Sequence, residues 1–97
     1  MANEIQTQKI DQLGRVCIPK EVMENVHYES RTTFEVEIRH GKIALFKAKK
    51  DSSNIKRAVD ELNRIVLPID VRKALSYEEG DSLEFRVEEV IFISKGE

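Results

Sequence analysis

Residues 11–19 of the chain read Asp-Gln-Leu-Gly-Arg-Val-Cys-Ile-Pro, and residues 60–68 read Asp-Glu-Leu-Asn-Arg-Ile-Val-Leu-Pro. The two stretches lie 49 positions apart, and each apolar position of the first is apolar in the second. Gly14 is replaced by Asn63, and Asn is the residue that best tolerates the left-handed backbone conformation after Gly. The repeat therefore predicts one tight turn in each half of the chain.

The match continues on the carboxyl-terminal side of both stretches. Its paired positions are Val22 and Val71, Tyr28 and Tyr77, Phe34 and Leu83, Val36 and Phe85. Near the end the offset falls to 48, so that Ile43, Leu45 and Lys47 match Ile91, Ile93 and Lys95. A self-match over this length indicates two copies of one supersecondary unit.

Each copy is expected to begin with two short strands separated by the tight turn. The first strands are predicted over residues 5–10 and 55–59, and the second over residues 15–18 and 64–67. Proline cannot donate to a strand ladder, so Pro19 and Pro68 end the second strands. Proline is also favoured at the first position of a helix, which places a helix next.

A short helix and a hairpin complete each copy. The helices are predicted over residues 20–26 and around Val71, Ala74 and Leu75, whose spacing is helical. Apolar residues then alternate with charged ones, as expected of half-buried strands, at Phe34, Val36 and Ile38 and at Leu83, Phe85 and Val87. His40-Gly41 and Glu88-Glu89 are predicted hairpin turns. The predicted fold class is mainly β with short helices.

The size of each copy determines how the two are arranged. The chain has 97 residues, and a unit of roughly half that length buries too little surface to be stable alone. We therefore expect one composite domain made of repeat 1 over residues 1–48, a polar linker over 49–54, and repeat 2 over 55–97.

Composition excludes several classes of protein. The chain is 40% hydrophobic and 35% charged, which favours a folded core over disorder. No apolar run approaches the roughly 18–20 residues that span a bilayer, so no membrane association is expected. A lone cysteine, Cys17, excludes an internal disulfide and is expected to be buried, since it lies in an apolar run. We expect no metal site, no cofactor and no enzymatic activity, because no catalytic or metal-ligating constellation appears.

The stretches from Lys9 to Glu21 and from Val59 to Leu75 resemble the signature of the AbrB/MazE/SpoVT family of DNA-binding domains. The resemblance covers nearly the whole chain twice. In that family two units interleave their strands into a swapped-hairpin β-barrel, usually as a homodimer. The resemblance implies that the two tandem copies form one such barrel as an intramolecular pseudo-dimer, and a further homodimer of whole chains stays open.

The same resemblance implies transcriptional regulation through double-stranded DNA, in a cytoplasmic, nucleoid-associated protein. Family contacts come from basic residues before the turn, from the arginine of the turn and from the start of the short helix. Carried over, with nearby substitutes in the first copy, the DNA-binding candidates are Lys9, Arg15, Lys20, Arg57, Arg64, Arg72 and Lys73. Gln8, Met23 and Glu24 occupy matching positions in the first copy, so the second copy is expected to contribute more.

The distribution of charge along the chain supports DNA binding, although the net charge of the chain is −2. Residues 56–73 contain five basic and three acidic side chains, whereas residues 74–97 contain two basic and seven acidic ones. A competing interpretation is that Arg15 and Arg64 are solvated turn residues paired with Asp11 and Asp60. In either case we expect the two aspartates to brace the turns, since a carboxylate is repelled by phosphate.

A second function class is a protein-binding module, either antitoxin-like or a partner of other AbrB-type regulators. Its support is the first copy, where Met23 would present an apolar side chain on an exposed helix. Binding to duplex DNA separates the two hypotheses.

Overall fold

The computed structural model describes residues 6–28 and 31–95, and its fold is mainly β with two short helices, as predicted. Residues 1–5 and 96–97, and with them the outer ends of the two predicted repeats, lie outside the described residues. The same order of strand, strand, helix, strand, strand occurs in both halves. The elements are β1 (Gln6–Lys9), β2 (Arg15–Cys17), α1 (Lys20–Asn25), β3 (Thr33–Arg39), β4 (Lys42–Lys47), β5 (Ile55–Ala58), β6 (Arg64–Val66), α2 (Ile69–Leu75), β7 (Ser82–Val87) and β8 (Ile91–Lys95).

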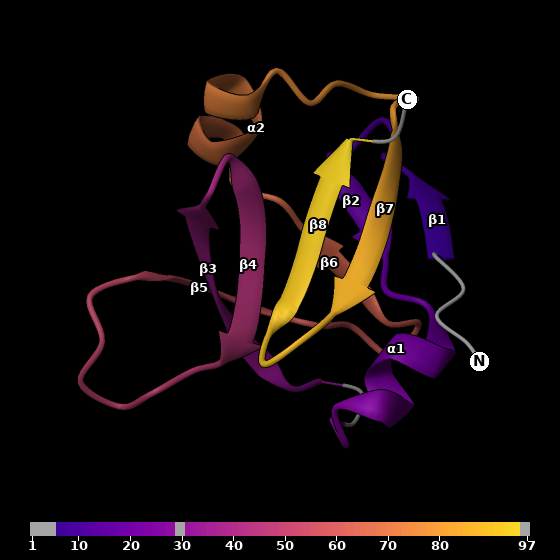
Figure 1. Ribbon diagram of the computed structural model, residues 1–97. Coiled ribbons are helices and arrows are strands. Elements are labelled where there is room, and N and C mark those ends of the chain that lie inside the picture. The colour runs from indigo at the N-terminus through magenta and orange to yellow at the C-terminus, as the bar shows by residue number, and fades with distance from the viewer. Residues whose placement is uncertain (1–5, 29–30, 96–97) are drawn as a thin grey trace.

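The strands form one six-stranded sheet and one two-stranded ribbon (Figure 1). The order in the sheet is β1-β7-β8-β4-β3-β5, and β2 pairs with β6 to form the ribbon. All pairings are antiparallel. β1 pairs with β7 and β5 pairs with β3, so each half of the chain gives its first strand to the hairpin of the other half. The two halves are therefore interleaved through their backbone hydrogen bonds.

Period-two alternation places one face of each hairpin in a shared core. Phe34 and Val36 on β3, and Leu83 and Phe85 on β7, are all buried in one hydrophobic cluster. Successive strand residues point to opposite faces, which puts the charged residues between them on the other side of the sheet. The predicted strands are confirmed, but Ile38, which was expected on the buried face of β3, is 42% exposed near the end of the hairpin, and Glu35 on the opposite face is buried.

The β2–β6 ribbon covers this core with only one of its faces. Val16 and Ile65 pair across the ribbon and are buried. Their strand neighbours Arg15, Cys17 and Val66 must therefore point outward. Cys17 is accordingly half-buried at the outer face, and the expectation of a core cysteine is wrong. The apolar run concealed this alternation, because Val66 is itself 43% exposed.

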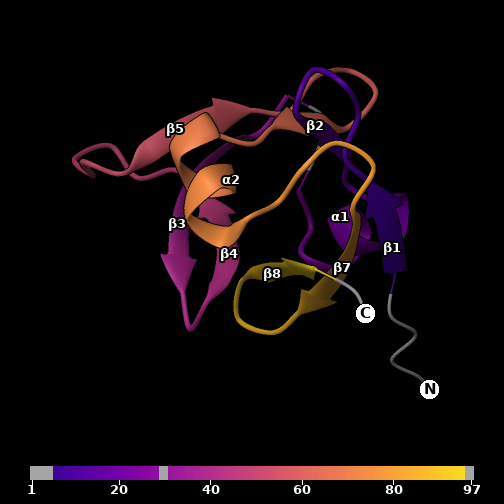
Figure 2. The same ribbon diagram turned by 90° about the horizontal axis from the view of Figure 1, so that it is seen from above.

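The helices lie at opposite sides of the molecule (Figure 2). α1 packs through Val22 and Met23, and α2 through Val71. Ala74, expected on the apolar face of α2, is exposed. In the described part of the chain, no helix is long and apolar enough to cross a membrane.

The segment between the halves is anchored to the sheet by a buried carboxylate. Residues 48–54 contain no strand and project to one side in both views. Glu35 accepts hydrogen bonds from the Lys49 backbone N–H (2.6 Å), the Ser52 hydroxyl (2.6 Å) and the Asn54 amide (2.9 Å). The Ser52 hydroxyl, followed by the Lys49 N–H, lowers the pKa of Glu35 to about 2. The linker is thus held by hydrogen bonds to an ionised carboxylate over most of the pH range.

Candidate nucleic-acid interface

The first tight turn is a closed hydrogen-bonded unit around one carboxylate. Asp11 Oδ1 accepts from the backbone N–H groups of Leu13 (2.9 Å) and Arg15 (2.8 Å), while its Oδ2 accepts from Arg15 Nε (2.8 Å). Gly14 adopts a φ of +79°, which a residue without Cβ takes at little cost. The Arg15 N–H is the largest of the causes that lower the pKa of Asp11. The carboxylate therefore stays charged and fixes the arginine.

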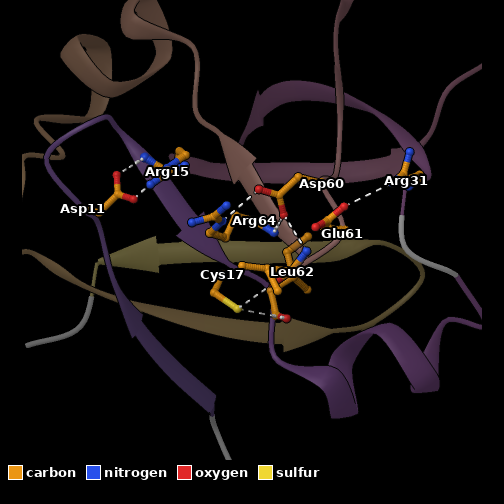
Figure 3. A network of polar contacts seen from close by, with 9 residues as sticks. Asp11, Arg15, Cys17, Arg31, Asp60, Glu61, Leu62 and Arg64 are labelled. Carbon is orange, nitrogen blue, oxygen red and sulfur yellow. Dashed lines mark hydrogen bonds and ion pairs between the residues drawn. The ribbon is translucent and has the colours of Figure 1, made fainter.

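The second turn repeats this geometry. Asp60 Oδ1 accepts from the N–H groups of Leu62 (2.9 Å) and Arg64 (2.8 Å), and Oδ2 accepts from Arg64 Nε (2.8 Å). Asn63 has a φ of +62°, so the predicted left-handed position is confirmed in both turns. The Arg64 N–H likewise lowers the pKa of Asp60. The prediction that both aspartates brace their turns is also confirmed (Figure 3).

The two arginines lie on the same outward face of the ribbon. Arg15 pairs with Val66, and Arg64 pairs with Cys17. Arg15 and Arg64 are therefore diagonal neighbours, which in antiparallel strands lie about 7–8 Å apart. The pairing with aspartate uses only Nε of each guanidinium, and neither has a further hydrogen bond to a described residue. The terminal nitrogens of both guanidinium groups can therefore donate to an acceptor on another molecule.

Arg72 joins the turn of the other half of the chain. It lies on α2, and its Nε donates to the Leu67 carbonyl (3.1 Å). A Cβ on Gly14 would lie 2.8 Å from Cζ and from Nη2 of Arg72, so the guanidinium rests directly on the glycine. The Leu67 N–H also donates to the Gly14 carbonyl (2.9 Å), which ties the start of α2 to this turn. Arg72 therefore belongs with Arg15 rather than with Arg64.

The turn at Arg64 meets a different helix start. The Ile18 N–H donates to the Asn63 carbonyl (2.7 Å), so the segment that leads into α1 is held against the second turn. Met23, which matches Arg72 in the repeat, is 3% exposed and packs in the core. The expectation of an exposed Met23 on a partner surface is wrong, because the side chain faces inward beside Val22.

The helix start beside Arg64 is electrostatically balanced. Lys20 Nζ lies 4.0 Å from a carboxylate oxygen of Glu24, in a fully solvated pair. Arg31 forms a second exposed pair with Glu61 at 3.2 Å (Figure 3). By contrast, Lys73 is exposed on α2 beside Arg72 and forms no ion pair with a described residue. The end of the ribbon near Arg15 is therefore the more basic of the two.

The remaining candidates precede the turns on edge strands. Lys9 ends β1 and is exposed, opposite Ser82. Arg57 is half-buried on β5, opposite Phe34, and its Nη1 donates to the Lys56 carbonyl (2.9 Å). In the described residues no group of three or more His, Cys, Asp or Glu side chains is arranged to hold a metal ion.

Two features of the interface were missed at the level of sequence. One is the contact between Gly14 and Arg72. The sequence indicates it only in that the matching positions of the repeat, Asn63 and Met23, are both changed. The second is the exposure of Leu13 and Leu62 at the tips of the turns, at 62% and 59%. Each leucine is identical in the repeat, which gave no indication of whether it is buried.

Known proteins are similar to this chain over part of its sequence and over most of its fold. Residues 56–96 match the family model described as antidote-toxin recognition MazE, bacterial antitoxin. A 44-residue stretch is 46% identical to the transition state regulatory protein AbrB of Bacillus subtilis (strain 168), covering 45% of this chain and 46% of that protein. The aligned region thus spans less than half of that relative. The solution structure of PHS018 from Pyrococcus horikoshii superposes with a TM-score of 0.57 over 98% of this chain and 95% of that one, at 16% identity, which shows a shared fold.

Proposed function

We propose that this chain, whose residues 56–96 match the MazE family model, is a transcriptional regulator that binds double-stranded DNA through the outer face of the β2–β6 ribbon. The observation that carries the proposal is the pair Arg15 and Arg64, each fixed by an aspartate and partly exposed, at 27% and 33%, on one face of the ribbon. A separation of about 7–8 Å corresponds to about two base-pair steps, so both can contact one short stretch of duplex.

The chemistry of this face suits DNA better than a neutral ligand. A guanidinium can bind a phosphate or the O6 and N7 acceptors of guanine in the major groove. The aspartates that orient the arginines are already paired, which reduces their repulsion of phosphate. Arg72 and Lys73 extend the basic surface at one end, while Lys9, Lys20 and Arg57 lie on the adjoining strands and helix. The proposed function needs no catalytic step and no cofactor.

The proposal includes the arrangement of the chain as two tandem copies. Residues 1–48 and 55–97 would be the two copies, joined by 49–54, and together they would form one swapped-hairpin barrel as an intramolecular pseudo-dimer. The exchange of β1 and β5 between the halves supports this. A cytoplasmic, nucleoid-associated location and a further homodimer are parts of the same proposal.

Titration of duplex DNA at two salt concentrations tests the function. If four to six basic side chains meet phosphates, the logarithm of the affinity falls with the logarithm of the salt concentration at a slope of about −4 to −5. In the variant Arg15→Ala/Arg64→Ala the slope becomes less steep by about 2. Arg86→Ala is the matched control, because Arg86 is exposed on β7 outside the ribbon. Absence of binding near 50 mM salt would refute the proposal.

A protein-binding role is the second candidate, and the match of residues 56–96 to an antitoxin family favours it. The burial of Met23 removes the surface on which that role was expected to rest. If duplex DNA fails to bind at low salt while the chain remains folded, the protein-binding role becomes the better account.

A further inference from the structure

The tips of both tight turns present a leucine to solvent at equivalent positions. Leu13 and Leu62 are 62% and 59% exposed, although the chain buries most of its other large aliphatic side chains. Their backbone N–H groups donate to Asp11 and Asp60 at 2.9 Å, so each tip is held in place. The leucines are thus presented at fixed positions without being packed against the core.

The leucines lie next to the two arginines along the chain. Each leucine lies two residues before Arg15 or Arg64, and Val66 adds a third exposed apolar side chain opposite Arg15. Leu13, Arg15 and Val66 therefore lie at one end of the ribbon, and Leu62 and Arg64 lie at the other. Apolar side chains do not bind phosphate, so the exposed leucines and Val66 indicate an additional, apolar contact.

The dimensions of the ribbon place the leucines at its two ends. The Gly14–Leu67 and Ile18–Asn63 hydrogen bonds extend the pairing over residues 14–18 and 63–67. This paired stretch spans four residue steps, about 13 Å, and Leu13 and Leu62 lie one residue beyond its opposite ends, in the turns. The leucines are therefore separated along the ribbon by the length of about four base-pair steps or more. The major groove admits a two-stranded ribbon, and the C5-methyl group of thymine is the apolar feature exposed there.

We propose that Leu13 and Leu62 contact thymine methyl groups in the major groove, beside the phosphates or bases bound by Arg15 and Arg64. The inference rests on the proposed DNA-binding function and adds a source of sequence preference to it. Duplex DNA is favoured over a protein partner because each leucine is flanked by a guanidinium that has no other acceptor for its terminal nitrogens among the described residues.

Replacing thymine with uracil removes only the methyl group and therefore tests the inference directly. The probe is a duplex of about 30 base pairs, roughly half of them A·T, prepared with deoxythymidine or with deoxyuridine throughout. Loss of one buried methyl contact weakens binding by about fourfold, and loss of two by about fifteenfold. We expect the full chain to prefer the thymine duplex by a factor in this range.

Three variants assign the preference to the leucines. Leu13→Ala/Leu62→Ala is expected to bind both duplexes equally, and each single variant to lose about half of the logarithmic preference. Ile55→Ala is the matched control, because Ile55 is also an exposed aliphatic residue but lies on the edge strand β5. All variants should keep the thermal midpoint of the parent chain, since the truncated side chains are exposed.

The outcomes distinguish this inference from the function on which it rests. Equal binding of both duplexes by the parent chain, with the steep salt dependence retained, overturns the inference and leaves DNA binding intact. A thymine preference that persists in Leu13→Ala/Leu62→Ala overturns the assignment to these residues. No binding to either duplex refutes both proposals, and the leucines then become candidates for a protein contact.

Discussion

Replacing Gly14 with Ala tests how α2 of one half packs on the turn of the other. Gly14 has a φ of +79°, and an added Cβ would lie 2.8 Å from Cζ of Arg72. The backbone would be strained by the side chain, and the guanidinium would be displaced from its place on the turn. The first effect acts on the backbone of residue 14 and the second on the Arg72 side chain. Their contributions to the unfolding free energy can therefore be measured separately.

The magnitudes follow from these contacts. An alanine in the left-handed region costs about 1–2 kcal/mol of unfolding free energy. Displacement of Arg72 breaks the 3.1 Å hydrogen bond from its Nε to the Leu67 carbonyl, a loss of about 1 kcal/mol. Gly14→Ala should therefore lose about 2–3 kcal/mol. Gly41→Ala is the control, because Gly41 has a φ of +73° and no atom within 4 Å of an added Cβ.

Urea denaturation of a double-mutant cycle measures the part that belongs to Arg72. In the background Arg72→Ala, Gly14→Ala should cost no more than Gly41→Ala, which gives a coupling energy of about 1 kcal/mol between Gly14 and Arg72. A coupling energy below about 0.3 kcal/mol would show that Arg72 moves aside without loss. In that case the Arg72 side chain would not couple α2 to the first turn.

Three further predictions concern the core, the linker and the interface. Ile65→Ala should lower the unfolding free energy by about 2–5 kcal/mol, whereas Val66→Ala on the opposite face of the ribbon should change it by less than about 0.5 kcal/mol; similar losses would contradict the assigned faces. The pKa of Glu35 is about 2 in the folded chain and 4.5 ordinarily, so its stabilising effect is present above about pH 4.5 and is lost as the pH falls towards 2. Glu35→Gln should flatten the dependence of the urea midpoint on pH in that window, and an unchanged slope would exclude Glu35 as its source. Arg72→Ala should weaken duplex binding by about tenfold, and more than Lys20→Ala, whose side chain is already paired with a carboxylate; equal affinities in an anisotropy titration would count against the more basic end.

The local chemistry of the turns could be predicted from the sequence. A Gly or Asn before the arginine, with an Asp three residues before the Gly or Asn, specifies a left-handed turn braced by a carboxylate, and both turns have this form. Pro19 and Pro68 correctly marked the helix starts. These features depend on neighbours within a few positions, which a sequence displays directly.

The faces of the short elements could not be predicted in the same way. Three-residue strands such as β2 and β6 are too short for an alternation to be distinguished from an apolar run, so the sequence does not show that Cys17 faces outward. In α1, Met23 matches the basic Arg72 of the second copy, and the repeat does not show that the Met23 side chain is buried. The pairing of β2 with β6 decides the case of Cys17, and the packing of α1 against β7 decides that of Met23. Both partners are distant in sequence.

The grouping of basic residues depended on strand exchange. Read copy by copy, Arg64 and Arg72 belong together, but the crossing of the chain through the ribbon brings Arg72 to Gly14 instead. The match of Gly14 with Arg72, and of Asn63 with Met23, becomes meaningful only once the ribbon pairing is known. The repeat shows which residues match between the copies, but only the strand pairing shows which of them are in contact.

The most direct test of the central claim is to locate the duplex on the folded chain. Titrating the isotopically labelled chain with a short duplex, and following its backbone amide signals by NMR, reports the surface that is covered. We expect the largest changes at Leu13, Arg15, Leu62 and Arg64, with smaller ones at Arg72. Changes concentrated on the outer face of β7 around Arg86, with the turns unaffected, would contradict it.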